Sequence, residues 1–559
     1  MMKRPDLRQL SIDPILVPLL SIIIFVAAHF QALTNPFVIN DDIRQQIYWM
    51  QQWQDKALYP GFWLSDYSRH YVPWGVQGIY RLASGFLDPI SFSKVLSGLL
   101  FVLASITFHG IGRVLKDRLT AWAVLASFWL MPFFLFRISG GLARGFAFPL
   151  LALFLLFWLS GRGWSMGWVL SCMALTIPYI FILSFTAVMM GRLKDAILDQ
   201  KGLPTPFPSK FGHWVLAGIG IVALFLWRQQ YMVSGFGPLV TAADMAGNPE
   251  FGLHGRYPIL PVPHFLWDLV VEPWQWIGPY RETGSMWVGI LGSLVVLGIA
   301  FWGARRFEWK MLSGKWQPFL YLGISSLLFY VLARIFLLKL FIPSRYLIYT
   351  VSLFYCVLLG LCFRGFLGSN LKPLAAKVLL ASVVGLSITR LYGVGVYDYS
   401  QYEPLYTVLN QTPKSSLIAG HPSLMDNILT FGRRNVFASF ELAHPWSKGL
   451  WQKLRPRLLD LFDAYYAKDS STVMKFCLKY RIDFLVVDNR HFTAEFLKNR
   501  PFFEPFDQMI QETVRNRRHF ALLTENSFPE IKINQYLRLL DLRETREKDF
   551  DDGDKRGTP

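Results

Sequence analysis

The sequence predicts a polytopic α-helical membrane protein of about eleven transmembrane helices, followed by an extracytoplasmic α/β domain. The first reason is composition. Of the 559 residues, 53% are hydrophobic and only 17% are charged, and the mean hydropathy is +0.32, a profile typical of membrane proteins. The second is a series of apolar segments separated by short basic loops. The third is a change in pattern after Tyr397, where short strand-like runs alternate with amphipathic helical ones. We therefore expect a transmembrane module over residues 1–397, an α/β domain over 398–543 and a disordered tail over 544–559.

The net charge of +18 raises the question of nucleic-acid binding. The basic residues do not gather on one face or in one tail; many lie in short loops between apolar segments, which is a mark of membrane topology. We therefore expect membrane lipids, and anionic headgroups in particular, as their partner, and no nucleic acid. Neither the four cysteines nor the ten histidines show metal-ligand or disulfide spacing.

The first apolar segment, residues 14–33, follows a basic stretch that contains Lys3, Arg4 and Arg8. We interpret it as an uncleaved anchor helix with a cytoplasmic N-terminus, although a cleaved signal peptide has similar features. Either interpretation places the next segment outside the cytoplasm. This first outer loop, about 34–92, is rich in tryptophan, so one or two interfacial helices are expected there.

The remaining apolar spans set the topology. They are expected near residues 93–112, 120–136, 145–160, 164–176, 177–190, 213–231, 286–303, 317–338, 344–363 and 374–394. With the N-terminus inside, the basic loops all fall on the cytoplasmic side and a second outer loop covers about 232–285. This agreement requires 164–190 to be two short helices that meet near Pro178. A single long span there would invert everything downstream.

An acidic pair, Asp41 and Asp42, lies just beyond the first apolar segment. The simplest explanation is helix capping, with Asn40 as N-cap and the two carboxylates favoured by the helix dipole. The alternative is a general base at the outer membrane surface. Other outer-loop residues that could act as a second acid or contact an acceptor are Asp66, His70, Asp244 and Glu250. Ordinary solvated loop residues would look the same.

Four cations near the predicted outer ends of helices are candidates for binding a phosphate: Arg137, Arg144, Lys339 and Arg345. We favour Arg345, because the run 342–346 opens a span directly from an outer turn and an arginine fork matches phosphate geometry. Snorkelling to lipid headgroups explains each cation about equally well.

The C-terminal segment predicts short buried strands at 416–420, 435–438 and 483–488, with helices over 454–466 and 472–480. It contains no G-x-G-x-x-G turn, no P-loop and no G-x-S-x-G elbow. We therefore expect an accessory or acceptor-handling domain.

Together, the many spans, the acidic pair after the first helix and the outer C-terminal domain resemble the GT-C superfamily of integral membrane glycosyltransferases. The turn 343–346, Pro-Ser-Arg-Tyr, is similar to the Pro-x-Arg-Tyr turn of many members, and 480–487 resembles a strand of their outer domains. The resemblance implies that Asp41 or Asp42 is the catalytic base. The Trp-Trp-Asp-Tyr-Gly sequence of oligosaccharyltransferases is absent, so peptide N-glycosylation is not supported.

A GT-C-like enzyme of the bacterial plasma membrane would transfer a sugar, with inversion, to an extracytoplasmic glycan, lipid or protein. Because that face of the membrane offers little nucleotide sugar, the donor would be a polyprenyl-phosphate sugar. Some members use a divalent cation such as Mg²⁺ or Mn²⁺ and others need none, so the cofactor stays open. Two alternatives remain: a transporter or flippase of lipid-linked or polysaccharide substrate, and a non-catalytic scaffold. Against the transporter, no internal repeat is evident and most charge lies at predicted span ends.

Overall fold

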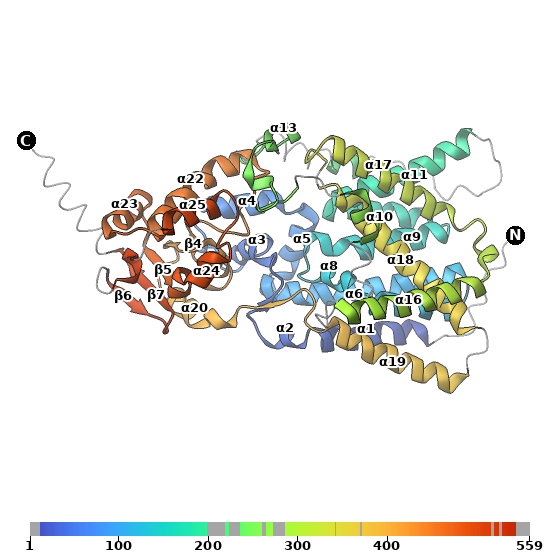
Figure 1. Cartoon of the computed structure of the whole chain (residues 1–559). Coiled ribbons are helices and arrows are strands. Elements are labelled where there is room, and N and C mark those ends of the chain that lie inside the picture. Colours follow the sequence, from blue (N-terminus) through green and yellow to red (C-terminus); the bar gives the residue numbers. More distant parts are fainter. Residues whose placement is uncertain are drawn as a thin grey trace, which may run out of the picture.

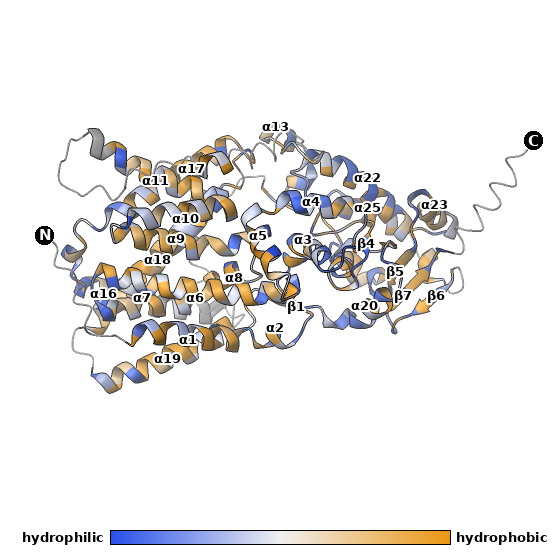
Figure 2. Cartoon of the chain, turned by 180° about the vertical axis from the view of Figure 1, so that it is seen from behind, coloured by the Kyte–Doolittle hydropathy of each residue, from blue (hydrophilic) through white to orange (hydrophobic). Residues whose placement is uncertain are grey.

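The computed structural model describes residues 12–197, 218–222, 235–259, 264–271, 286–340, 342–368, 372–515, 519–524 and 528–543. A bundle of apolar helices forms one end of the molecule and an α/β domain forms the other (Figure 1). The bundle is predominantly hydrophobic along its helices, whereas polar segments are frequent in the α/β part (Figure 2). The expected tail, 544–559, and most of the expected span 213–231 lie outside the described residues.

The bundle helices follow the apolar segments of the sequence. They are α1 (Asp13–Ala28), α6 (Pro89–Leu115), α7 (Arg118–Leu130), α8 (Pro132–Ile138), α9 (Ala147–Leu159), α10 (Gly163–Thr176), α11 (Pro178–Ile197), α16 (Met286–Arg306), α17 (Gln317–Ile335), α18 (Ser344–Leu367) and α19 (Pro373–Leu391). Among the described residues, four of these helices, α6, α17, α18 and α19, are long and apolar enough to cross a membrane. A fifth span results if α7 and α8 are taken together.

Two prolines break the helices of the bundle. The predicted break near Pro178 is confirmed: α10 ends at Thr176, and Ile177 takes a non-helical backbone with φ −147° and ψ 76°. The predicted span over 120–136 is formed by two helices, because α7 and α8 meet at Met131 with a bend of 68°. In both places the proline ring disfavours helical geometry at the residue before it.

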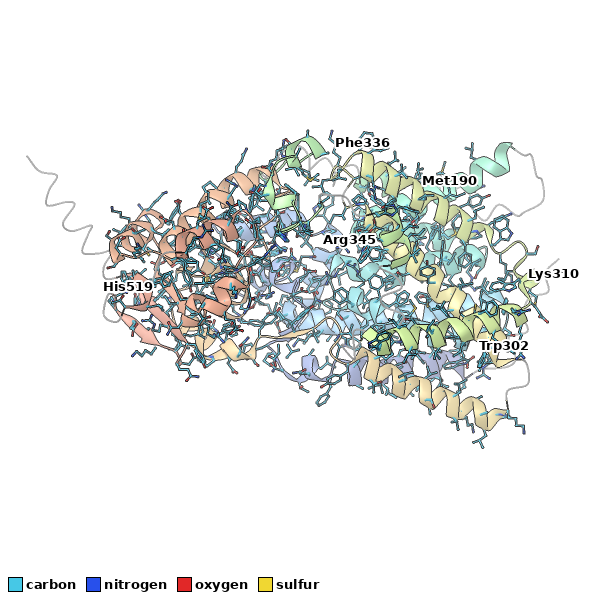
Figure 3. The ribbon with its side chains drawn as sticks, in the orientation of Figure 1. Met190, Trp302, Lys310, Phe336, Arg345 and His519 are labelled. Carbon is cyan, nitrogen blue, oxygen red and sulfur yellow. The ribbon has the colours of Figure 1, made fainter. Side chains whose placement is uncertain are left out.

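Several of the predicted basic loops share one end of the bundle. Lys116 pairs with Glu308 at 2.8 Å, and Arg364 pairs with Asp117 at 3.1 Å. These contacts join the α6–α7 connection to the α16–α17 connection and to the last turn of α18. The predicted basic residues Lys201 and Lys210 lie outside the described residues. Figure 3 labels Lys310 at this end, far from the α/β domain.

The segment predicted to be the first outer loop folds over the opposite end of the bundle. It contains α2 (Phe30–Thr34), β1 (Val38–Ile39), α3 (Ile43–Gln46), a 3₁₀ turn (Tyr48–Trp53), α4 (Trp63–Tyr71) and α5 (Trp74–Ala83). The apolar residues Ile43, Ile47 and Met50 are all buried. Ile43 begins α3, Met50 lies in the 3₁₀ turn, and Ile47 links the two elements.

The α/β domain has a five-stranded mixed sheet in the order β4-β3-β5-β7-β6. Its strands are β3 (Leu417–Ala419), β4 (Asn435–Val436), β5 (Phe484–Asp488), β6 (Glu530–Lys532) and β7 (Leu537–Asp541). Its helices are α20 (Glu403–Asn410), α21 (Pro422–Asn427), α22 (Lys448–Tyr465), α23 (Ser470–Tyr480), α24 (Ala494–Lys498) and α25 (Phe506–Val514). The first three strands and the helices α22 and α23 lie where the sequence predicts them. Strands β6 and β7 were not predicted.

The bundle and the α/β domain meet beside the first outer loop. Strand β1 pairs antiparallel with β2 (Tyr397–Asp398), which leads into the α/β domain. One hydrophobic core runs from the bundle into residues of that domain such as Ile418 and Met425. The chain after β1, which carries the acidic pair, therefore lies at the junction of the two parts.

Candidate active site

Asn40 fixes the backbone that carries the acidic pair. It is 1% exposed, and its Nδ2 donates a hydrogen bond of 2.6 Å to the carbonyl of Gly395. Its Oδ1 accepts hydrogen bonds from the Asp42 N–H at 3.2 Å and from Arg144 Nη2 at 3.1 Å. Gly140, with φ +92°, packs so close that a Cβ there would lie 2.9 Å from the Asn40 Cβ. The position of the pair therefore depends on contacts from two distant parts of the chain, residues 140–144 and Gly395.

Asp42 forms an ion pair with Arg144, and Gln45 donates a hydrogen bond to its other carboxylate oxygen. The Asp42 and Arg144 side chains are each 17% exposed. Asp42 is the N-cap residue of α3, but its side chain makes no capping hydrogen bond. Capping therefore does not account for this carboxylate; its partner is a guanidinium.

Asp41 is half-buried, and one of its oxygens accepts the Asp42 N–H at 3.0 Å. Within the described part of the chain, no side chain donates a hydrogen bond to it. Burial and the Asp42 carboxylate raise the pKa of Asp41. Arg144 and Arg44 lower this pKa, but the net shift is upward. A carboxylate with a raised pKa and no side-chain donor is suited to accept a proton.

A group of cations lies beside this pair. Burial, followed by the Asp42 carboxylate, raises the pKa of Tyr71 to about 12, while Arg345 and Arg144 oppose the shift. Both guanidinium groups are therefore within electrostatic reach of the Tyr71 hydroxyl. The half-buried Arg345 lies on the α18 turn toward the α/β domain (Figure 3), and its Nη1 has no hydrogen-bond partner among the described residues.

Arg137 belongs to the same group. It is 8% exposed, and its guanidinium lies 5.1 Å from the centre of the Phe133 ring. Arg137, Arg345 and Arg144 all act electrostatically on the Tyr349 hydroxyl. Three of the four predicted phosphate-binding cations are thus gathered around Tyr349, and one of them, Arg144, pairs with Asp42. The fourth, Lys339, is exposed and forms no ion pair with a described residue.

The other predicted acids lie elsewhere. Asp66 is exposed on α4, and its backbone carbonyl is hydrogen-bonded to His70 Nδ1 at 2.9 Å. Asp244 caps α13 (Ala242–Met245) and pairs with Lys448 at 2.7 Å. Glu250 is 2% exposed and accepts a 2.7 Å hydrogen bond from Arg455. The acids of the second outer loop therefore hold α22 rather than joining Asp41 and Asp42.

A buried ionic network that the sequence analysis missed joins α3 to the α/β domain. Arg44, 7% exposed, donates from Nη2 to Glu441 Oε1 at 3.3 Å, and its guanidinium lies 4.4 Å from the Tyr399 ring centre. Arg256 donates to the second oxygen of Glu441, also at 3.3 Å. Burial, together with the nearby Asp426, raises the pKa of Glu441 to about 8. In the sequence, the one feature that could have indicated this network was Arg44, a cation next to the acidic pair.

The chemistry that this arrangement allows is limited and specific. Asp41 can take a proton, and the cluster of guanidinium groups can stabilise a phosphate anion next to it. Among the described residues, no group of three or more His, Cys, Asp and Glu side chains is placed to hold a metal ion.

No protein-family model matches the chain, and no curated protein matches its sequence. Solved structures do match. ArnT from Cupriavidus metallidurans bound to undecaprenyl phosphate is 10% identical, with a TM-score of 0.50 over 94% of this chain and 97% of that one. The oligosaccharyltransferase of Archaeoglobus fulgidus in its apo form is 11% identical, with a TM-score of 0.47 over 91% of this chain and 73% of that one. The likeness to ArnT extends over nearly the whole of both chains and concerns the fold. The chain therefore shares the overall fold of ArnT.

Proposed function

We propose that the protein is a glycosyltransferase that moves a sugar from a polyprenyl-phosphate carrier to an extracytoplasmic glycan, lipid or protein. The observation that carries the proposal is the half-buried Asp41–Asp42 pair beside Arg144, Arg345 and Arg137 at the junction of the two parts. One carboxylate and several guanidinium groups are what a transfer from a phosphate leaving group needs. The shared fold with ArnT, solved with undecaprenyl phosphate, supports the same substrate class.

In the proposed reaction Asp41 is the general base. The acceptor hydroxyl attacks the anomeric carbon of the sugar, its proton passes to Asp41, and the bond from that carbon to the phosphate oxygen breaks. Polyprenyl phosphate leaves with the bond's electron pair, and the anomeric configuration inverts. Asp41 suits this role because its raised pKa favours proton uptake and no described side chain donates to it.

Asp42 and the arginines have a different role in the proposal. Asp42 orients Arg144, which already makes hydrogen bonds to two partners. Arg144 and Arg345 hold the leaving phosphate, because a guanidinium fork matches phosphate oxygens and stays charged. Arg137 adds positive charge, because it reaches the same Tyr349 hydroxyl as they do.

The proposal also assigns the faces of the membrane. The end of the bundle that carries the basic loops would face the cytoplasm, as the bias of such loops predicts. The first outer loop and the α/β domain would then be extracytoplasmic, in a bacterial plasma membrane. The α/β domain contacts α3, next to the acidic pair, through Arg44 and Glu441. In the proposal this domain receives the acceptor.

Asp41→Asn tests the proposal, with Asp66→Asn as the matched control on the same loop. In cells that lack the chromosomal gene, a plasmid copy of wild type or D66N should restore glycan modification seen by mass spectrometry of surface glycans. D41N should not, although it reaches the membrane in equal amount. Purified D41N should still bind undecaprenyl phosphate, because the arginines are intact.

Full modification by D41N would rule out Asp41 as the base. If D41N, D42N and the double variant were all active, the catalytic assignment of the pair would fail. Loss of lipid translocation with glycosyl transfer intact would instead support a transporter.

A further inference from the structure

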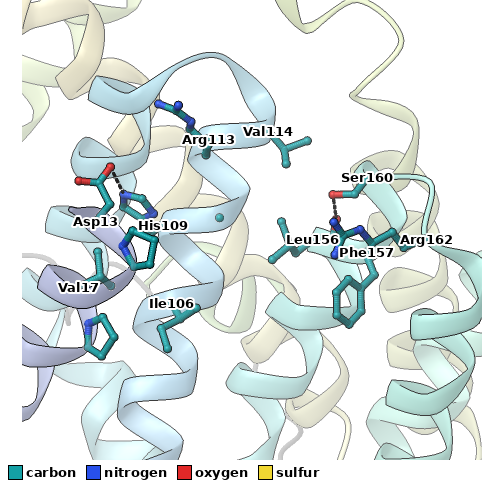
Figure 4. A pocket seen from close by; sticks show the side chains of 13 residues that line it. Asp13, Val17, Ile106, His109, Arg113, Val114, Leu156, Phe157, Ser160 and Arg162 are labelled. Atoms are coloured by element: carbon teal, nitrogen blue, oxygen red, sulfur yellow. Dashed lines mark hydrogen bonds and ion pairs between the residues drawn. The ribbon is translucent and has the colours of Figure 1, made fainter. Parts of the chain in front are cut away.

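A cavity lies at the end of the bundle that carries the basic loops, away from the acidic pair. It has a volume of about 460 Å³ and opens between α1, α6 and α9 (Figure 4). Its inner wall is apolar and includes Val17, Ile106, Leu156 and Phe157. Its rim carries Arg113, at the end of α6, and Arg162, between α9 and α10. The cavity is therefore amphipathic, with an apolar interior and a cationic rim.

The charges around the rim do not cancel. The carboxylate in the lining, Asp13, forms an ion pair with Arg118. Arg118 donates hydrogen bonds of 2.8 Å and 2.6 Å to its two oxygens. His109 Nε2 also lies 3.8 Å from an Asp13 oxygen. Arg113 and Arg162 are exposed, and no carboxylate of the described residues pairs with either. The rim thus presents two guanidinium groups without an anion.

We propose that this cavity binds an anionic glycerophospholipid. Arg113 and Arg162 would hold the headgroup phosphate, and the first part of an acyl chain would lie against Ile106, Leu156 and Phe157. The argument rests on charge complementarity and on position. The cavity lies at the ends of helices apolar enough to sit in a bilayer, where anionic headgroups meet basic side chains. The site is separate from the proposed catalytic centre, whose Arg345 is near the opposite end of α18 from the basic loops (Figure 3).

The test is lipid titration of the purified full-length protein in detergent, read by native mass spectrometry. Phosphatidylglycerol should bind more tightly than phosphatidylcholine, which has a zwitterionic headgroup. The double variant Arg113→Gln/Arg162→Gln should bind phosphatidylglycerol about tenfold more weakly, because two charge-assisted contacts are lost. The matched control is Arg305→Gln/Arg306→Gln, two exposed arginines of α16 that do not line the cavity. It should bind as wild type does.

A second variant tests the apolar half independently. Ile106 is 43% exposed, so Ile106→Trp should fold and fill the cavity without changing its charge. It should weaken phosphatidylglycerol binding to a similar extent. Added inorganic phosphate at millimolar concentration should not displace the lipid.

Three outcomes would overturn the proposal. The first is equal binding of the two lipids by wild type. The second is a loss in the Arg305/Arg306 control as large as in the Arg113/Arg162 variant. The third is displacement by inorganic phosphate with no effect of I106W, which would make the rim a site for a soluble phosphate. If the glutamine variant does not fold, two other variants test the proposal. The double variant Arg113→Lys/Arg162→Lys should retain most of the phosphatidylglycerol binding, and I106W should lose it.

Discussion

A single methyl group at Gly140 should disable the site without touching a charged residue. Gly140 has φ +92°, and its added Cβ would lie 2.9 Å from Cβ, 3.0 Å from Cγ and 3.1 Å from Oδ1 of Asn40. Asn40 in turn binds the Gly395 carbonyl, the Asp42 N–H and Arg144. Gly140→Ala should therefore displace the residue that positions the acidic pair.

The magnitude follows from two separate costs. An L-residue forced into a left-handed backbone loses about 1–2 kcal/mol. Overpacking against the buried Asn40 adds about 1–3 kcal/mol. Gly161 separates the two, because it also has positive φ, +67°, but has nothing within 4 Å of an added Cβ. Gly161→Ala should pay only the first cost.

The assays are thermal unfolding of both purified variants in detergent and glycan modification in complemented cells. Gly140→Ala should unfold at a clearly lower temperature than Gly161→Ala. It should also lose about tenfold to a hundredfold in transfer rate, since a displacement of about 1 Å in a reacting group can cost that much. Gly161→Ala should keep wild-type transfer. Equal unfolding temperatures together with full activity of G140A would refute the idea that this contact positions the pair.

Three further predictions concern separate interactions. Arg144→Lys should weaken undecaprenyl phosphate binding by about tenfold and Arg144→Gln by more, measured by native mass spectrometry, because an ammonium keeps the charge but not the fork. Burial and the nearby Asp426 raise the pKa of Glu441 from its ordinary 4.5 to about 8 in the folded protein. The contribution of Glu441 to stability is therefore complete below about pH 4.5 and is lost as the pH rises through 8. Between pH 5 and pH 9 the unfolding temperature should fall less steeply in Glu441→Gln than in the wild-type protein. Lys94 donates hydrogen bonds of 2.6 Å and 2.9 Å to two backbone carbonyls at the end of α2, and Lys94→Met should cost about 2 kcal/mol of stability by denaturant titration.

Local signals in the sequence were enough for most of the bundle. The lengths of the apolar segments were enough to predict where its helices lie. The break at Pro178 was predicted because the basic loops fall on one side of the membrane only if residues 164–190 form two helices. The break at Met131 was missed, although Pro132 has the same local effect, because neither length nor loop charge demanded a second segment there. Strand β7 was also missed. Its residues Leu537 to Leu540 are all buried and show no alternation between two faces, so they do not stand out from a buried helical run.

The candidate site was predictable only in part. Asp41 and Asp42 stood out because they follow the first apolar segment, and Arg345 because it opens a span after an outer turn. Asp244 and Glu250 had the same standing in the sequence, yet the fold directs them to Lys448 and Arg455. A loop carboxylate looks alike in the sequence whether it faces a substrate or holds a neighbouring helix.

The class of protein, the course of most helices and the grouping of basic loops could all be predicted from the amino-acid pattern. These properties depend on hydrophobicity and charge summed over neighbouring residues, which a linear pattern records. Only the tertiary structure decided which charges meet. Arg44 and Glu441 are 397 positions apart, and Arg144 and Asp42 are 102 apart. Ion pairs act over a few ångströms, so the packing of the whole chain decides which carboxylate has a raised pKa and which is held by an arginine.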